Sequence, residues 1–279
     1  MSPAVGRIGF HLAAVALAAL AALRLAGIVH VAAWVLGAAA LGLALVLFAA
    51  LYLPWFGLFG RPLRRGPAAL GLVARTFDDG PDAAATPVVL AALQRRGHRA
   101  TFFVIGTQAA AAPEVIRAIL AAGCTVGNHT HRHSWLTPCY GPGRLREELE
   151  RATAALVAAG GEAARPRFVR PPVGLLGPYF APAAAAAGLR LVACSGRAGD
   201  ASLWPLARER VLRRVARALQ PGAIIALHDG AEVRGRSAPA PALIEAVLDL
   251  VEAKGLRSVT LEELCATSPG PSPSPAAAR

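Results

Sequence analysis

The feature that most constrains the fold is an alternation of short apolar runs and longer helix-like stretches that begins at residue 71. Glycines such as Gly97, Gly123 and Gly188 separate many of these segments. Strands that alternate with helices over short connections predict parallel strands covered by helices. This pattern favours a barrel-like α/β fold, with a doubly wound open sheet as the alternative. The expected strands are 72–77, 100–105, 124–127, 167–169, 189–194, 223–227 and 256–260, and the expected helices are 86–96, 112–122, 143–159, 178–187, 205–219 and 240–254.

The residues before this alternation are almost entirely apolar. Between residues 8 and 59, the only strongly polar or ionisable side chains are His11, Arg24 and His30. The run at 31–53 is long enough to cross a hydrocarbon core of about 30 Å at about 1.5 Å per residue. The whole stretch exceeds the usual apolar core of a signal peptide, about 7–15 residues, and lacks a clean cleavage site.

The sequence therefore predicts a membrane anchor over residues 1–60, formed by two transmembrane helices at about 8–28 and 31–53. A single span over 31–53 and a signal peptide with Arg7 as its positively charged n-region are the alternatives. The protein is expected to be integral to the cytoplasmic membrane and to contact its lipids. Arginines flank both spans, so the positive-inside rule favours a cytoplasmic position for the large domain, whereas a single span would reverse it.

Composition and charge exclude several functional classes and motifs. The net charge of +12 comes almost entirely from arginine, and no basic run is interleaved with aromatic residues, so nucleic-acid binding is not expected. The four cysteines, at 124, 139, 194 and 265, have no CxxC spacing, which excludes zinc-ribbon and thioredoxin-like motifs but leaves a disulfide open. Residues 61–70 are expected to be a linker, and the Pro/Ser-rich tail 267–279 is expected to be disordered.

Two adjacent acids, Asp78 and Asp79, follow the first expected strand and precede Gly80-Pro81. Side chains alternate along a strand, so neighbouring carboxylates point in different directions and can have different roles. A plain Asp-Asp-Gly surface turn is the simple alternative. Because ligands bind at the carboxyl ends of strands in α/β folds, this position favours a functional site.

Three histidines are concentrated in the segment after the third expected strand. His129 and His133 are four residues apart, and His131 lies between them. Residues spaced i and i+4 share one face of a helical turn and can bind one metal. Two histidines with one carboxylate and an open position are typical of catalytic zinc sites, whereas a polar surface loop is the alternative.

Three further polar residues follow later expected strands. Arg170 begins the turn Arg170-Pro171-Pro172-Val173-Gly174, and an arginine fork suits a carboxylate partner. Asp200 follows the fifth expected strand, and His228 ends the apolar run 223–227. All of these side chains are expected at the same edge of the sheet.

Together these segments resemble the polysaccharide deacetylase family, also called the NodB homology or carbohydrate esterase family 4 proteins. The resemblance covers about residues 71–265 and implies an irregular (β/α) barrel of about seven strands, here a NodB-like domain over 71–266. Thr76-Phe77-Asp78-Asp79-Gly80 matches the first family motif, His129-Thr130 with His133 the second, Arg170 to Gly174 the third, and the run that ends at His228 the fifth.

The resemblance implies a metal site and a catalytic base. Asp79, His129 and His133 would hold a divalent metal, with Zn²⁺ expected first and Co²⁺ or Mn²⁺ as alternatives. Asp78 would be the general base that acts on water activated by the metal, and Arg170 would orient its carboxylate.

The resemblance also implies an acid and an oxyanion site. His228 would protonate the leaving amine as general acid, and Asp200 would tune or orient it. The backbone N–H of Val173 would stabilise the oxyanion, and Pro172 and Leu227 complete the substrate-binding residues. His131 and Asp229 have no part in this scheme.

The implied function is metal-dependent removal of N-linked acetyl groups from a sugar in a polysaccharide or a lipid-linked glycan. The alternatives are a non-catalytic glycan-binding protein on the same fold and a hydrolase of a non-sugar amide. Three departures from the family pattern leave the acyl group and the glycan open: Ala201 replaces a tryptophan, Ala226 replaces a leucine, and Val173 stands where an aromatic residue is frequent.

Overall fold

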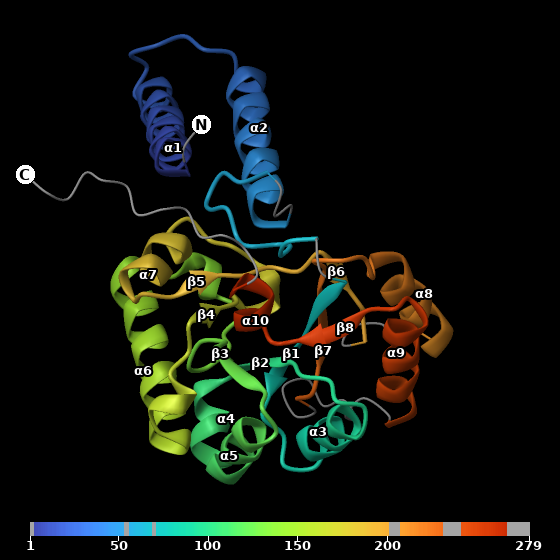
Figure 1. The fold of residues 1–279 in the computed structure, drawn as a ribbon. Helices are drawn as coiled ribbons and strands as arrows, with labels where there is room; N and C mark the ends of the chain where they lie inside the picture. Colours follow the sequence, from blue (N-terminus) through green and yellow to red (C-terminus); the bar gives the residue numbers. More distant parts are fainter. Residues whose placement is uncertain (1–2, 53–55, 69–70, 201–206, 231–240, 267–279) are drawn as a thin grey trace, which may run out of the picture.

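The computed structural model describes residues 3–52, 56–68, 71–200, 207–230 and 241–266. Within these ranges the chain forms one eight-stranded sheet surrounded by helices, and a helical hairpin stands on one side of it (Figure 1). Every pairing between these strands is parallel. The sheet curls into an irregular (β/α) barrel, so the predicted fold class is confirmed and the open doubly wound sheet is not found.

All seven predicted strands are present, together with a short strand, β6, that was not predicted. The order across the sheet is β5-β4-β3-β2-β1-β7-β6, and β8 pairs with the first half of β1. Because β1 is central, its carboxyl end has neighbours on both sides. The strands are β1 (Leu72–Gly80), β2 (Thr101–Val104), β3 (Thr125–Asn128), β4 (Phe168–Val169), β5 (Arg190–Leu191), β6 (Gly196–Arg197), β7 (Ile224–His228) and β8 (Arg257–Val259).

The predicted helices are also present, and two short ones were missed. Helix α4 has the sequence Gly-Thr-Gln-Ala-Ala-Ala, and its alanines were discounted because alanine is abundant throughout the chain. Helix α10 directly follows β8, without the glycine or proline that marks other junctions. The helices around the sheet are α3 (Ala85–Arg95), α4 (Gly106–Ala111), α5 (Pro113–Ala121), α6 (Pro142–Gly160), α7 (Phe180–Ala186), α8 (Arg208–Ala218), α9 (Pro241–Ala253) and α10 (Leu261–Ala266).

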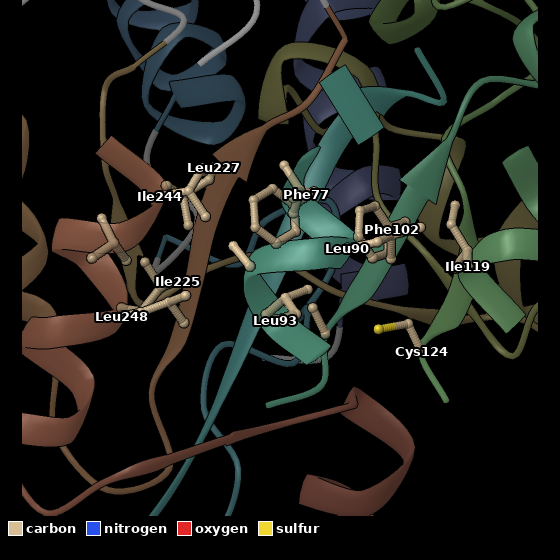
Figure 2. Packing of buried hydrophobic residues seen from close by; sticks show 14 of the residues in the cluster. Phe77, Leu90, Leu93, Phe102, Ile119, Cys124, Ile225, Leu227, Ile244 and Leu248 are labelled. Carbon is tan, nitrogen blue, oxygen red and sulfur yellow. The ribbon is translucent and has the colours of Figure 1, made fainter. Parts of the chain in front are cut away.

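Alternation along β1 divides the barrel core into two layers. Val73 and Phe77 belong to the layer between the sheet and the surrounding helices, whereas Ala74 belongs to a second buried cluster with Phe103 and Ile224. Figure 2 shows Phe77 packed among side chains from β2, β7, α3 and α9 in the outer layer. The burial of β1 on both faces fixes the position of its carboxyl end, where the two acids lie.

The apolar N-terminal residues form two helices, α1 (Pro3–Leu25) and α2 (Ala33–Tyr52), each long and apolar enough to cross a membrane. Most of the side chains of the two helices are exposed. The hairpin nevertheless contacts the barrel, because Tyr179 Oη lies 3.2 Å from His11 Nε2 and the two rings stack.

The segment between the hairpin and β1 pairs with the sheet. Leu63 donates its N–H to Leu191 O at 2.9 Å and accepts the N–H of Ala193 at 2.8 Å. The four cysteines are all free. The predicted tail 267–279, the last two residues of the predicted linker and Ala201 lie outside the described residues.

Candidate active site

Asp78 and Asp79 lie at the carboxyl end of β1, where the register with β2 shifts between Asp78 and Gly80. Asp79 has a φ of 71°, a left-handed conformation that non-glycine residues seldom adopt and that is common at functional sites. The irregularity directs the two buried carboxylates differently. Asp78 contacts Arg170, whereas Asp79 faces the histidine loop.

His129 and His133 come from the loop that follows β3. Thr130 and His133 have φ values of 65° and 50°, so this loop also contains left-handed non-glycine residues. Thr130 Oγ1 accepts the N–H of His133 at 3.2 Å, which closes a tight turn. The turn brings both imidazoles to the same carboxylate, although the loop is not the helical turn that the i and i+4 spacing suggested.

Two buried residues that sequence reasoning missed hold this loop in place. Asn128 Oδ1 accepts the N–H of Thr130 at 2.8 Å, and its Nδ2 donates to Leu149 O in α6 at 2.9 Å. Glu148 Oε2 accepts the N–H groups of His131 and Arg132 at 3.0 and 2.9 Å. These contacts depend on α6 packing against the loop, which no local spacing in the sequence reports.

Asp79, His129 and His133 form a buried cluster whose ligand atoms all lie within 4.8 Å of one another. The Nε2 atoms of His129 and His133 lie 3.2 and 3.0 Å from Asp79 Oδ1. His129 Nδ1 lies 2.8 Å from the carbonyl oxygen of Arg170 and donates to it, so Nε2 is the ring nitrogen that faces the cluster. A backbone carbonyl on the far nitrogen is the usual way to orient a metal-binding histidine, and the donor set fits a divalent cation.

The same contacts decide the ionisation of Asp79. Burial raises the pKa of this carboxyl, but hydrogen bonds and charges of His129 and His133 outweigh burial and hold the pKa below its usual range. Asp79 is therefore a carboxylate at neutral pH, the form that binds a cation. The ring of His131 does not join the cluster, since its Nδ1 lies 2.5 Å from the place that a Cβ on Gly106 would occupy.

Arg170 holds Asp78 in a second buried contact. Its Nη1 donates to Asp78 Oδ1 at 2.6 Å and to Thr76 Oγ1 at 2.7 Å. The guanidinium also lies over the ring of Phe103, 4.1 Å from the ring centroid. Removing either partner of a buried pair leaves an uncompensated charge, so each partner holds the other in place.

His228 ends β7 beside Asp78 and is held by Asp200. Asp200 Oδ1 lies 2.9 Å from His228 Nδ1, and Oδ2 accepts the backbone N–H of His228 at 2.9 Å. Burial lowers the pKa of His228, but the hydrogen bond and charge of Asp200, with the charges of Asp78 and Asp79, raise it to about 9. The ring is therefore an imidazolium at neutral pH and can donate a proton from Nε2.

Asp229 lies behind the cluster, although no role was predicted for it. It is fully buried, its Oδ2 accepts the hydroxyl of Thr86 at 2.6 Å, and its N–H donates to Asp78 O at 3.2 Å. A Cβ on Gly80 would lie 2.6 Å from Asp229 Oδ1, so only glycine fits there. Burial is the main cause that raises the pKa of Asp229 to about 7. The residue packs against the chain that carries both acids.

A cavity of about 510 Å³ joins these groups, and Asp78, Asp79, His129, Arg170 and His228 all line it. Of the predicted substrate-binding residues, only Val173 lines the cavity. Val173 lines the cavity with a φ of 50°, whereas Pro172 is buried and is not part of the wall.

The prediction for Leu227 needs correction. Strand alternation directs this fully buried side chain into the helix layer near Ile244, as Figure 2 shows, and the preceding residue, Ala226, lines the cavity instead.

Comparisons with known proteins identify the family. The family model "Polysaccharide deacetylase" matches residues 66–192, which include Asp78, Asp79, His129, His133 and Arg170. A chitooligosaccharide deacetylase from Bradyrhizobium sp. (strain ANU 289) is 40% identical over 156 residues, which cover 56% of this chain and 69% of the relative. A peptidoglycan-N-acetylglucosamine deacetylase from Bacillus cereus is 31% identical over 198 residues, which cover 69% of this chain and 87% of the relative.

Solved structures agree with the sequence matches. A family 4 carbohydrate esterase from Streptomyces lividans in complex with acetate has 31% identity and a TM-score of 0.59, and the match covers 68% of this chain and 92% of that chain. Peptidoglycan deacetylase PdaC from Bacillus subtilis has 26% identity and a TM-score of 0.59, over 69% of this chain and 89% of that chain. The barrel, its motifs and these relatives establish that the chain belongs to the polysaccharide deacetylase family, the family 4 carbohydrate esterases.

Proposed function

We propose that this protein is a metal-dependent deacetylase that hydrolyses the N-acetyl group of an amino sugar in a membrane-associated glycan. One observation carries the proposal: a buried Asp-His-His cluster, an arginine-held carboxylate and an aspartate-held imidazolium line or adjoin one cavity. Relatives named for the deacetylation of chitooligosaccharides and peptidoglycan support the substrate class.

Asp79, His129 and His133 would hold the metal, with Zn²⁺ as the first candidate because of its preference for nitrogen and oxygen ligands in such sets. When bound, the cation would supply Lewis-acid polarisation of the acetyl carbonyl and would lower the pKa of water in the site. The carbonyl of Arg170 keeps the proton of His129 on Nδ1, which leaves Nε2 for the metal.

Asp78 is the proposed general base. Its contact with Arg170 holds the carboxylate at the cavity wall, where it takes a proton from the attacking water. The backbone N–H of Val173, at the turn that lines the cavity, is the proposed donor to the oxygen that becomes negative as the carbonyl carbon turns tetrahedral.

His228 is the proposed general acid. Its imidazolium gives a proton to the nitrogen of the amide as the C–N bond breaks, so that the amine leaves in neutral form. The products are acetate and a free amino sugar, and one water molecule is consumed. Asp200 positions the ring and stabilises its positive charge.

We also propose that α1 and α2 form an anchor in the cytoplasmic membrane. Their exposed apolar side chains support this, and the arginines at 61, 64 and 65 favour a cytoplasmic position for the barrel. Reporter fusions at residue 27 and at residue 279 test the topology, and a periplasmic signal from the fusion at 279 would refute this orientation.

Acetate release from a panel of N-acetylated glycans tests catalysis. The assay compares the wild type and the Asp78→Asn variant, each loaded with Zn²⁺ or Co²⁺. The substitution should lower kcat by about 10²- to 10⁴-fold. Asp249→Asn makes the same chemical change at an exposed position on α9 and serves as the control. Equal rates for wild type and Asp78→Asn would eliminate Asp78 as the base, and no metal in the purified protein would eliminate the metal site.

A further inference from the structure

The catalytic cavity extends to the membrane hairpin. The cavity that contains Asp78, Asp79 and His129 also reaches Leu51 and Tyr52, the last two residues of α2. One continuous space of about 510 Å³ therefore connects the polar cluster at the end of β1 with the apolar end of a helix long enough to cross a membrane.

Two arginines that have no carboxylate partner in the described part of the chain line the same cavity. Arg197 in β6 and Arg214 in α8 are exposed, and neither side chain has a hydrogen bond or ion pair with any residue in the described ranges. Asp78 and Asp79 are the only acids among the described lining residues, and Arg170 already pairs with Asp78. Both arginines therefore leave uncompensated positive charge in the cavity wall.

The close packing of Arg197 on the turn after β4 places one of these charges beside the reaction centre. A Cβ on Gly174 would lie 2.0 Å from Arg197 Nη2, so the guanidinium lies directly against the backbone of Gly174. Gly174 also has a φ of 70° and follows Val173, the proposed oxyanion donor. An anionic group on the substrate can therefore reach Arg197 while a neighbouring group occupies the acetyl position.

The end of α2 has the side chains expected at a membrane surface. Tyr52 is 53% exposed and stacks on Phe48, with ring centroids 4.6 Å apart. Tyrosines are enriched where a transmembrane helix meets the headgroup region. At about 1.5 Å per residue, the 20 residues of α2 span about the thickness of a hydrocarbon core, so Tyr52 marks its boundary.

We propose that the substrate is an N-acetylated sugar joined through a phosphate ester to a membrane lipid. The sugar lies at the Asp-His-His cluster, the phosphate contacts Arg197 and Arg214, and the lipid chain leaves the cavity along the end of α2. Arginine forks match phosphate oxygens, and the apolar residues Leu51 and Leu176 complete the wall toward the hairpin. This inference rests on the proposed deacetylase function and specifies its substrate.

Three substrates with the same sugar test the inference on the full-length, Zn²⁺-loaded protein in lipid nanodiscs. They are farnesyl phosphate esterified to N-acetylglucosamine, farnesyl N-acetylglucosaminide without the phosphate, and soluble N-acetylglucosamine 1-phosphate. We expect the lipid phosphate to have at least about tenfold higher kcat/KM than either other compound, as hydrogen bonds to charged groups predict. In the double variant Arg197→Ala/Arg214→Ala, the ratio of kcat/KM for the lipid phosphate to kcat/KM for the neutral lipid should fall about tenfold or more. Arg213→Ala, on the same helix but outside the described cavity lining, should keep the wild-type ratio.

Equal kcat/KM for the charged and neutral lipids, or a double variant that retains the preference, would overturn the phosphate contact. Equal kcat/KM for the soluble phosphate and the lipid phosphate would overturn the lipid part. Calorimetric binding of farnesyl phosphate and farnesol gives a second readout that needs no catalysis, and equal affinity for both would also overturn the inference. Tighter binding of farnesyl phosphate without acetate release from any substrate, chitooligosaccharides included, would instead refute the deacetylase function and leave the phosphate contact standing.

Discussion

Replacing Asp200 with asparagine tests the assignment of His228 as general acid, because Asp200 contacts both the ring and the backbone of this histidine. The pKa of His228 is raised from 6.5 to about 9. At about 1.4 kcal/mol per pKa unit, this favours the imidazolium by about 3 kcal/mol. Burial lowers the pKa of His228, and the hydrogen bond and charge of Asp200 are the largest contributions that raise it. Asparagine keeps the shape but removes the charge, so the pKa should fall by about one to two units.

The expected loss of activity follows from the titration curve. At about pH 8.5, a group with a pKa of about 9 is about three-quarters protonated, whereas one with a pKa of about 7 is about 3% protonated. A fall of one to two pKa units should therefore cost the variant about 3- to 25-fold in kcat/KM at this pH from protonation alone, and much less near pH 6.5. A cation bound at Asp79 would reduce the contribution of that carboxylate to the pKa of His228 in both proteins. Wild type and variant are therefore compared at equal metal loading.

The measurement is the pH profile of kcat/KM between about pH 6 and 10, with acetate release as the signal. Titration of ¹⁵N-labelled histidine by NMR gives the pKa of His228 independently. Asp249→Asn is the control for loss of a surface carboxylate and should retain the wild-type profile. An alkaline limb at the same pH in Asp200→Asn and wild type, together with an unchanged pKa, would refute the role of Asp200.

Three other substitutions test separate parts of the structure. Arg170→Ala leaves the carboxylate of Asp78 buried and unpaired, so chemical denaturation should show a loss of about 3–5 kcal/mol; a loss below about 1 kcal/mol would contradict the buried pair. His133→Ala should lower bound metal, measured by mass spectrometry, whereas His131→Ala should retain it; equal metal content in the two variants would contradict the ligand set. Arg75 is fully buried, burial is the main cause that lowers its pKa to about 9, and none of its nitrogens has a partner in the described residues. Arg75→Leu should therefore raise the melting temperature, and a lower one would show that Arg75 has a stabilising contact.

The barrel and the position of its site were predictable from sequence because both follow from local patterns. Parallel strands place their carboxyl ends at one edge, so Asp78, Arg170 and His228 could be assigned to neighbouring positions before any contact was known. The length of β1 and its burial on both faces agree with this reasoning. By contrast, β6 is only two residues long, and its pairing with β7 depends on the path of the chain after β5.

The residues that hold the site in place were not predictable in the same way. Asn128 and Glu148 act through α6, and Asp229 acts through Thr86, which is 143 positions away in the chain. Such contacts follow from packing between elements, for which spacing within one segment provides no signal. The error at Leu227 had a local signal, however, because strand alternation alone places Leu227 and Ala226 on opposite faces of β7.

The hairpin and the barrel share structure, so α2, one of the helices that we propose as the anchor, also forms part of the catalytic cavity. Leu63, between α2 and β1, pairs with Leu191 and Ala193, and both of these residues line the catalytic cavity. Phe59, just after α2, is 1% exposed and belongs to a buried cluster with residues of α7. Removing residues 1–60 would therefore delete part of the cavity wall and expose apolar surface on the barrel. On the proposed binding of a lipid-linked substrate along α2, a barrel without residues 1–60 lacks the surface that receives the lipid, so substrate preference has to be measured with residues 1–279 in a bilayer.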